Sequence, residues 1–255
     1  MYTLEGKTAL VTGASRGIGK ATALALAEAG AEVLVHYGRS AEEAESLVAA
    51  IRAKGGRAHA VTADLADPDG AKLLAEQVGA IVGKRLDVLV LNAGVSKAAR
   101  IADYKVEDLD NLFATNVRGP FFLVQQLLPL LGEGSSIVAV SSVVAGSVVG
   151  KPGTDNPSIL AYASTKGALE TLVMNWAAIL GPSGIRVNAV APGVIDTDMS
   201  NFTKTEAGRE TALAMQALKR IGKPEDVADV VAFMASDASR WITGASIPVD
   251  GGSKL

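Results

Sequence analysis

Seven short runs of apolar residues, many of them β-branched, alternate with longer amphipathic stretches along the chain. Most of these runs are apolar at nearly every position instead of every second one, which is typical of parallel strands buried on both faces. The alternation predicts an α/β fold, namely a Rossmann-type, doubly wound parallel sheet of about seven strands with helices on both faces. We expect strands over residues 7–12, 31–37, 57–63, 86–93, 135–142, 185–192 and 246–249, and helices over residues 17–29, 40–54, 69–82, 105–131, 160–180 and 224–235.

No linker, low-complexity tract or block of charge divides the sequence, so we expect residues 1–255 to form a single domain. The formal net charge of -3 argues against a nucleic acid or an anionic membrane as partner. The longest apolar run is too short to cross a bilayer. The absence of cysteine excludes disulfides and thiolate chemistry, and only two histidines occur, so no metal site is expected.

Both ends of the chain bear on its location. The N-terminal "MYTLEGK" has neither the basic region nor the apolar core of a secretion signal, so we expect a cytoplasmic protein. The last three residues, Ser253-Lys254-Leu255, match a peroxisomal address. We interpret this as a chance match of three residues, and a peroxisomal location stays open if the source is eukaryotic.

The first expected strand runs into "TGASRGIG", residues 12–19, and a helix follows. Glycines at this place let the backbone turn tightly and approach a pyrophosphate, while the helix N-terminus offers free N–H groups. The spacing is G-x-x-x-G-x-G instead of the commoner G-x-G-x-x-G. The segment predicts a dinucleotide site with contacts from Gly13, Ser15, Arg16, Gly17, Ile18 and Gly19.

The same segment also fits G-x-S-x-G, the nucleophile elbow of α/β-hydrolases, with Ser15 as nucleophile. In that fold the histidine base comes last in the chain, after the serine and the acid. No histidine follows His59. The hydrolase interpretation is therefore rejected.

The end of the second strand predicts which dinucleotide is bound. Folds of this kind that bind NAD place an acidic residue here to hold the ribose 2′-hydroxyl. The segment has no acid before Glu42 and carries Arg39 instead. Arg39, Arg16 and Ser40 could hold a 2′-phosphate, the alternative being that both arginines are ordinary surface residues. We predict NADP(H) in preference to NAD(H), with further contact from Tyr37.

Tyr162 and Lys166 lie four residues apart in an expected helix, so their side chains share one face. A free phenol has a pKa of about 10 and transfers protons poorly near neutrality. A nearby ammonium and an oxidised nicotinamide would both favour the phenolate. The pair predicts a proton-transfer group, although Tyr-x-x-x-Lys by itself is common in amphipathic helices.

Further motifs occur in order along the chain, and each lies at the end of an expected strand or in an expected helix. They are Asp64-Leu65, "NAG" at 92–94, "TN" ending at Asn116, "VSS" ending at Ser142, "YASTK" at 162–166 and "PG" at 192–193. With "TGASRGIG" at the start and "VDGG" at the end, the whole chain resembles the classical short-chain dehydrogenase/reductase family. The resemblance implies a seven-stranded parallel sheet, usually in a homotetramer, and hydride transfer to carbonyls.

The resemblance also implies catalytic roles. Tyr162 would be the general acid in reduction and the base in oxidation. Lys166 would hold the nicotinamide ribose and lower the pKa of the tyrosine. Ser142, in preference to Ser141, would hydrogen-bond the substrate carbonyl, and Asn116 would help to hold a proton-relay water.

The implied cofactor contacts extend beyond the glycine loop. Asp64 would accept from the adenine amino group, and the "NAG" segment would pass beneath the adenosine ribose. For Asp64 and Thr197 a cap or turn role is an alternative. The full additional set is Asp64, Leu65, Asn92, Ala93, Gly94, Pro192, Gly193, Ile195 and Thr197, besides Tyr162 and Lys166.

The chain departs from the family pattern between Ser142 and Tyr162, where extra residues fall in the turn-rich "GKPGTDNPSI". We expect this segment to form a loop at the substrate mouth. Met199, Phe202 and Met215 could line the opposite side of the pocket, although such residues are more often core.

The leading functional prediction is an NADPH-dependent reductase of a small ketone or aldehyde, reversible as an alcohol dehydrogenase. Two alternatives are a 3-oxoacyl-[acyl-carrier-protein] reductase and a protein that senses NADP(H) without turnover. Carrier-protein reductases that the chain resembles have arginines near the end of the helix before the serine strand and near the end of the tyrosine helix. The matching stretches 127–134 and 176–184 hold a single charge, Glu133. We therefore favour a free ketone over a carrier-bound acyl chain.

Overall fold

The computed structural model describes residues 3–150, 153–253 and 255. Lys151 and Pro152 of the extra loop, and Lys254 of the C-terminal tripeptide, lie outside the described residues. Within these ranges, seven parallel strands form one sheet in the order β3-β2-β1-β4-β5-β6-β7. The strands are β1 (Thr8–Val11), β2 (Glu32–Tyr37), β3 (Arg57–Thr62), β4 (Val88–Leu91), β5 (Ser136–Val140), β6 (Arg186–Pro192) and β7 (Ser246–Val249).

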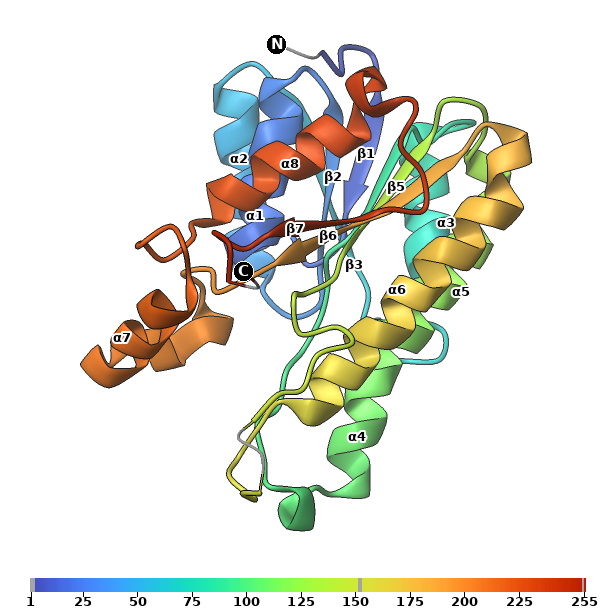
Figure 1. The fold of residues 1–255 in the computed structure, drawn as a ribbon. Coiled ribbons are helices and arrows are strands. Elements are labelled where there is room, and N and C mark those ends of the chain that lie inside the picture. The colour runs from blue at the N-terminus through green and yellow to red at the C-terminus, as the bar shows by residue number, and fades with distance from the viewer. Residues whose placement is uncertain (1–2, 151–152, 254) are drawn as a thin grey trace.

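Helices cover both faces of the sheet (Figure 1). One face is covered by α1 (Gly17–Glu28), α2 (Ala41–Ala53) and α8 (Pro224–Ala235), and α1 packs against α8. The other is covered by α3 (Gly70–Val82), α5 (Gly119–Leu127) and α6 (Leu160–Leu180). The predicted seven-stranded doubly wound fold is confirmed.

Successive side chains of each strand point to opposite faces, so the sheet separates two hydrophobic cores. In β4, Val88 and Val90 pack with α1, α2 and α8, whereas Leu89 and Leu91 pack with α3, α5 and α6. Because both faces are covered, each position must be apolar, which explains why these strands lack an alternating pattern.

The strand order reverses between β1 and β4, which lie side by side in the sheet. In an open α/β sheet, ligands bind at this point, in the crevice outside the carboxyl ends of the strands. The segment 12–19 follows β1 and the segment 92–94 follows β4, so both predicted cofactor segments lie at this crevice.

The helix predicted over residues 105–131 is wrong as a single regular element. It consists of α4 (Val106–Phe113), a π-helical turn (Ala114–Arg118), α5 and a 3-10 turn (Leu128–Leu130). Pro120 lies just after the π-helical turn, and it lacks the N–H that a regular helix continuing from α4 would use at this position. Gly119 allows close packing, since a Cβ there would lie 2.7 Å from the carbonyl oxygen of Leu65.

One helix was not predicted. After 3-10 turns over Asp198–Lys204, α7 (Glu206–Met215) extends from the body of the molecule (Figure 1). Of its residues only Ala212 is buried, so packing against the rest of the molecule contributes little to this helix. Its start is nonetheless capped, since the Thr205 hydroxyl accepts a hydrogen bond from the Gly208 N–H at 3.2 Å.

Across the described part of the chain, no helix is at once long and apolar enough to cross a membrane.

Candidate active site

The glycine loop has the shape that a pyrophosphate site requires. Gly13 and Gly17 have φ angles of 63° and 55°, in the left-handed region that favours glycine. A Cβ on Gly19 would lie 2.3 Å from the carbonyl oxygen of Gly13, so no larger residue fits there. The loop leads into the N-terminus of α1, whose free N–H groups attract anions. These residues fit a dinucleotide phosphate.

Two polar side chains, the buried Thr12 and the half-buried Asn92, tie this loop to the segment after β4. The Thr12 hydroxyl accepts hydrogen bonds from the backbone N–H groups of Asn92 and Ala93 at 2.9 and 3.0 Å. The Asn92 amide donates to the carbonyl oxygens of Thr12 and Gly13 at 2.9 and 3.0 Å. The structure thus brings the two predicted segments together, and it adds Thr12 to the residues that hold them.

His36 also supports the glycine loop, although it was not among the site residues predicted from the sequence. This residue lies in β2 and is 2% exposed. Its Nδ1 accepts from the Gly13 N–H at 3.1 Å, and its Nε2 lies 3.0 Å from the carbonyl oxygen of Ala63. Since Nδ1 accepts, Nε2 carries the proton and the ring is neutral. Burial lowers the pKa of His36 to about 4, against smaller opposing effects of the hydrogen bond with Ala63 and of the charge of Asp64. The available signal was a polar residue inside an otherwise apolar strand.

The predicted catalytic group assembles beside this crevice. Tyr162 and Lys166 lie in the first turns of α6, 9% and 4% exposed. The Tyr162 side chain hydrogen-bonds with that of Ser142, just beyond β5. The Lys166 Nζ donates to the carbonyl oxygen of Val140 at 2.7 Å and lies 5.5 Å from the centre of the Tyr162 ring. Ser141 contacts Glu170 instead, so Ser142 is the serine that faces the tyrosine.

Burial dominates the titration of this group. It raises the pKa of Tyr162 to about 12, and the hydrogen bond with Ser142 acts in the opposite direction. It also lowers the pKa of Lys166 to about 8. The Lys166 ammonium and an oxidised nicotinamide are together expected to lower the pKa of Tyr162, whereas in the protein by itself desolvation of the phenolate dominates.

Asn116 lies in the π-helical turn and is 1% exposed. Its Oδ1 accepts from the Val95 N–H at 2.9 Å, and its Nδ2 donates to the carbonyl oxygen of Val95 at 2.9 Å. The second Nδ2 hydrogen is donated to the Thr165 hydroxyl on α6 at 3.0 Å. The side chain therefore uses both of its amide hydrogens to join the segment after β4 to the tyrosine helix.

The arginines predicted to select the cofactor both lie near carboxylates. Arg39 Nη2 is 3.7 Å from Asp64 Oδ2, and Arg16 Nη1 is 3.8 Å from Asp198 Oδ2. The Arg39 side chain is 92% exposed, so a weak ion pair is all that holds it. Asp64 also accepts from the Ala66 N–H at 2.9 Å, which is the turn role left open above.

Other residues at the ends of β2 and β3 are divided between the core and the surface. The Leu65 side chain is buried in the core. The Tyr37 carbonyl oxygen accepts from the Thr62 hydroxyl at 3.2 Å, and Ser40 stands at the N-cap of α2 without a side-chain capping bond.

The segment after β6 reaches the glycine loop at Thr197 as well as at Asp198. A Cβ on Gly17 would lie 3.3 Å from Cγ2 of Thr197, so these two residues are neighbours. Pro192 accepts from the Val143 N–H at 3.0 Å, beside the serine. The Gly193 N–H donates to Val249 at 3.0 Å. The Ile195 side chain is buried in the core, so any contact of this residue with a cofactor is left to its backbone.

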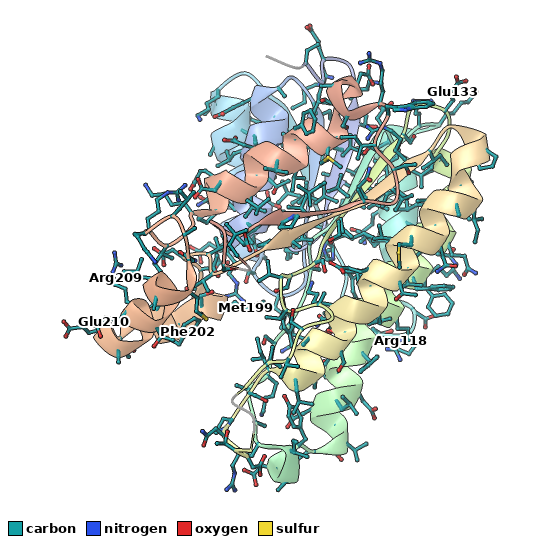
Figure 2. All side chains as sticks on the ribbon, in the orientation of Figure 1. Arg118, Glu133, Met199, Phe202, Arg209 and Glu210 are labelled. Atoms are coloured by element: carbon teal, nitrogen blue, oxygen red, sulfur yellow. The ribbon has the colours of Figure 1, made fainter. Side chains whose placement is uncertain are left out.

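The extra residues before Tyr162 pair with the segment after β4. Ala99 and Ser158 exchange backbone hydrogen bonds at 3.1 and 3.0 Å, and Asp155 accepts from the Ile101 N–H at 2.9 Å. Tyr104 donates to the carbonyl oxygen of Lys97 at 2.8 Å. Met199 and Phe202, which were expected to line the opposite side of the pocket, lie in the 3-10 turns just before α7. Both side chains are about half exposed (Figure 2).

No group of three or more histidine or acidic side chains in the described ranges is arranged to hold a metal ion.

Comparison with known proteins decides the family. A family model described as enoyl-(acyl carrier protein) reductase matches residues 13–254. Versicolorin reductase of Emericella nidulans is 41% identical over 264 residues, covering 99% of this chain and 97% of that protein. A short chain dehydrogenase from Burkholderia cenocepacia in complex with NADP superposes with a TM-score of 0.91 at 39% identity, covering 99% of each chain. The chain belongs to the short-chain dehydrogenase/reductase family.

Two further members are similar to this dehydrogenase/reductase. The 3-oxoacyl-[acyl-carrier-protein] reductase FabG of Staphylococcus aureus is 42% identical over 248 residues, covering 96% of this chain and 97% of that protein. The angucycline C-6 ketoreductase LanV with bound NADP superposes with a TM-score of 0.89 at 39% identity, covering 99% of this chain and 97% of that one. The chain is thus an oxidoreductase of a family that uses nicotinamide dinucleotides, and its similar members include ketoreductases.

The pKa of His36 predicts a pH dependence of stability. Its value is about 4 in the folded protein and about 6.5 when unfolded, so only the unfolded state takes up a proton between these values. The stability that depends on neutral His36 is complete above pH 6.5 and is lost as the pH falls toward 4, by up to about 3 kcal/mol. Urea unfolding at pH 7.5, 6 and 5 measures this loss.

His36→Asn keeps an oxygen that can accept from the Gly13 N–H but does not titrate in this range. It should reduce the fall in stability between pH 7.5 and 5, whereas His59→Asn, which removes the chain's other imidazole, is the matched control. An unchanged slope in His36→Asn would contradict the assignment.

Proposed function

We propose that this chain reduces the carbonyl group of a free ketone or aldehyde with NADPH, reversibly, and that Tyr162 is the proton donor. The observation that carries the proposal is the hydrogen bond between Tyr162 and Ser142, with Lys166 one helical turn behind. This group lies at the same edge of the sheet as the glycine loop. A proton donor beside a dinucleotide site is the arrangement that carbonyl reduction requires.

Burial keeps Tyr162 in the protonated form that a donor needs, but a pKa of about 12 makes the phenol a weaker acid than a free one. In the proposed reaction the Lys166 ammonium and an oxidised nicotinamide would favour the phenolate and offset this effect of burial. Ser142 can donate a second hydrogen bond to the carbonyl oxygen and stabilise it as it gains charge. Lys166, with a pKa of about 8, is largely protonated at pH 7 and available for ribose hydroxyls. A bound nicotinamide dinucleotide supplies the hydride.

Tyr162→Phe should lose nearly all turnover and still bind NADPH, because only the proton donor is removed. Lys166→Ala should impair both, because the ammonium is also proposed to hold the ribose. Steady-state kinetics and fluorescence titration with NADPH separate the two effects. A Tyr162→Phe enzyme with more than about a tenth of the original kcat, a loss of under about 1.4 kcal/mol, would show that another group donates the proton.

We further propose a preference for NADPH over NADH. The proposal is supported by the position of Arg39 at the end of β2, where no acidic residue precedes Glu42. The guanidinium is almost fully exposed and held by one long contact to Asp64, so it can turn toward a phosphate. Arg16 stands at the N-cap of α1.

NADPH should bind at least about tenfold more tightly than NADH, which corresponds to about 1.4 kcal/mol. Arg39→Asp should reduce or reverse this preference, since it replaces the cation by a group that repels a phosphate. Dissociation constants from fluorescence titration of both dinucleotides measure it. Equal affinities in the unmodified protein would refute the proposal.

The names of similar proteins do not choose between free and carrier-bound substrates, because versicolorin, an angucycline and an acyl carrier protein each appear among them. The stretches 127–134 and 176–184 precede β5 and β6 and lie at the amino ends of these strands, where the Gly134 N–H donates to the carbonyl oxygen of Gly184 at 2.9 Å. The candidate site lies at the carboxyl ends, so the lack of basic residues in these stretches does not decide which substrate is bound. Figure 2 shows Glu133 at the end of the molecule away from α7.

The charged residues near the expected substrate mouth bear more directly on the choice between a free and a carrier-bound substrate. Lys97 lies 3.4 Å from Asp108, and Arg100 donates to Asp103 at 2.6 Å. Lys204 lies 4.0 Å from Asp198. Each of these cations is offset by a carboxylate. Arg209, a further candidate, extends from the outer side of α7 (Figure 2). An acidic carrier protein would need an unpaired basic surface here, so we propose a free substrate, with the carrier-protein reductase as alternative.

The same acyl group presented on a carrier protein and as a short thioester distinguishes these functions. The two substrates should give kcat/KM values within about tenfold of each other, that is within about 1.4 kcal/mol. A value on the carrier that is more than tenfold higher, and that falls steeply with added salt, would establish the alternative. Turnover of any ketone would exclude a sensor without catalysis.

We also propose that the chain forms homotetramers in the cytoplasm. The outer surfaces of α4, α5 and α6 expose large apolar side chains around a hollow of about 690 Å³. Such a surface favours association with a second copy, and light scattering at micromolar concentration measures it. Phe113, Phe121 and Phe122 line this hollow, and Leu128 and Met174 are also exposed.

A further inference from the structure

One face of α6 carries three polar side chains, one helical turn apart, at positions 162, 166 and 170. The first two belong to the site described above. The third, Glu170, accepts a hydrogen bond from the Ser141 hydroxyl at 2.9 Å. Successive turns of α6 are therefore tied by side chains to the consecutive residues 140–142 at the end of β5.

The same carboxylate oxygen has a second partner. Glu170 Oε1 accepts from the Ser246 hydroxyl at 2.7 Å, and Ser246 opens β7. The two serines differ in their surroundings: Ser141 is 2% exposed, whereas Ser246 lies at the surface. The buried Ser141 hydroxyl needs its partner, and a hydrogen bond to a charged acceptor is stronger than one to a neutral acceptor.

The remaining contacts of α6 with the sheet are mostly apolar. Leu169, Val173 and Trp176 pack in the core on that face. Apolar contacts are not directional, so they hold the helix against the sheet without setting its rotation or its position along its axis closely. The hydrogen bond between Glu170 and Ser141 is directional. It acts next to Ser142 and two turns from Tyr162, where a shift of an ångström would misalign the proton donor.

We propose that Glu170 is a positioning residue: its carboxylate holds α6 against the end of β5 so that Tyr162 meets Ser142. The inference rests on the proposed function of those two residues. The bond to Ser141 carries the positioning, and the bond to Ser246 contributes to stability alone.

Four variants separate these roles. Glu170→Ala and Ser141→Ala each break the bond to β5, and each should lower kcat by about 10- to 100-fold while the Kd for NADPH stays within about twofold. Glu170→Gln keeps an acceptor oxygen and should retain kcat within about threefold. Ser246→Ala is the matched control, which removes the other hydroxyl from the same carboxylate. It should retain kcat within about twofold and lower Tm.

The double variant Glu170→Ala/Ser141→Ala should lose no more kcat than either single variant, because the same bond is broken in all three. If Ser246→Ala lowers kcat as much as Ser141→Ala does, Glu170 acts through general stability and the inference is overturned. It is also overturned if Ser141→Ala and Glu170→Ala keep kcat within about twofold. Should Glu170→Ala fail to fold, the Ser141→Ala, Ser246→Ala and Glu170→Gln enzymes decide by the same criteria.

Failure of this inference is distinguishable from failure of the proposed function. If the Tyr162→Phe enzyme remains active, Tyr162 is not the proton donor and the proposed function fails, independently of Glu170. If the Tyr162→Phe enzyme is inactive but the Ser141→Ala and Glu170→Ala enzymes are unaffected, only the proposed role of Glu170 fails.

Discussion

Burial of the parallel sheet on both faces is the constraint on which the rest of this molecule depends. Helices cover each face, so the strands must be apolar almost throughout, as the buried run Val88–Leu91 shows. Polar side chains that do chemistry are thereby restricted to the strand ends. The reversal of strand order between β1 and β4 brings two such ends together, and the end of β5 lies next in the sheet. The location of the site therefore follows from the burial of the sheet by helices on both faces.

The polar groups buried at this edge are paired with one another, which holds the loops in place without a ligand. Thr12, His36 and Asn92 bind backbone groups of the glycine loop and its neighbours. An unpaired buried group of this kind would cost about 1–3 kcal/mol. Asn116 repeats the arrangement between Val95 and Thr165. A site held in this way needs little rearrangement when a ligand binds, which strengthens binding.

Desolvation shifts three titrations in one direction, toward the neutral form. It lowers the pKa of His36 to about 4 and of Lys166 to about 8, and it raises the pKa of Tyr162 to about 12. For His36, neutrality is what allows Nδ1 to accept from the glycine loop. For Tyr162, desolvation holds the phenol in the protonated form and makes it a weaker acid, so the proposed proton transfer needs a positive charge that opposes the burial, such as the Lys166 ammonium or an oxidised nicotinamide.

From the sequence alone, the fold class, the helix over 160–180 and the glycine loop could be predicted, because hydrophobic periodicity and motif spacing are local properties. The catalytic roles of Ser142, Tyr162 and Lys166 were inferred from the motifs that occur in order along the chain. The π-helical turn around Asn116 and the exposed α7 could not be predicted, since the first interrupts a continuous apolar and helical pattern without a signal of its own and the second buries only Ala212. Only the tertiary structure decided the partners of His36, Glu170 and Ile195. Glu170 bonds residues 29 and 76 positions away, and desolvation of Tyr162 and Lys166 depends on every element that covers them.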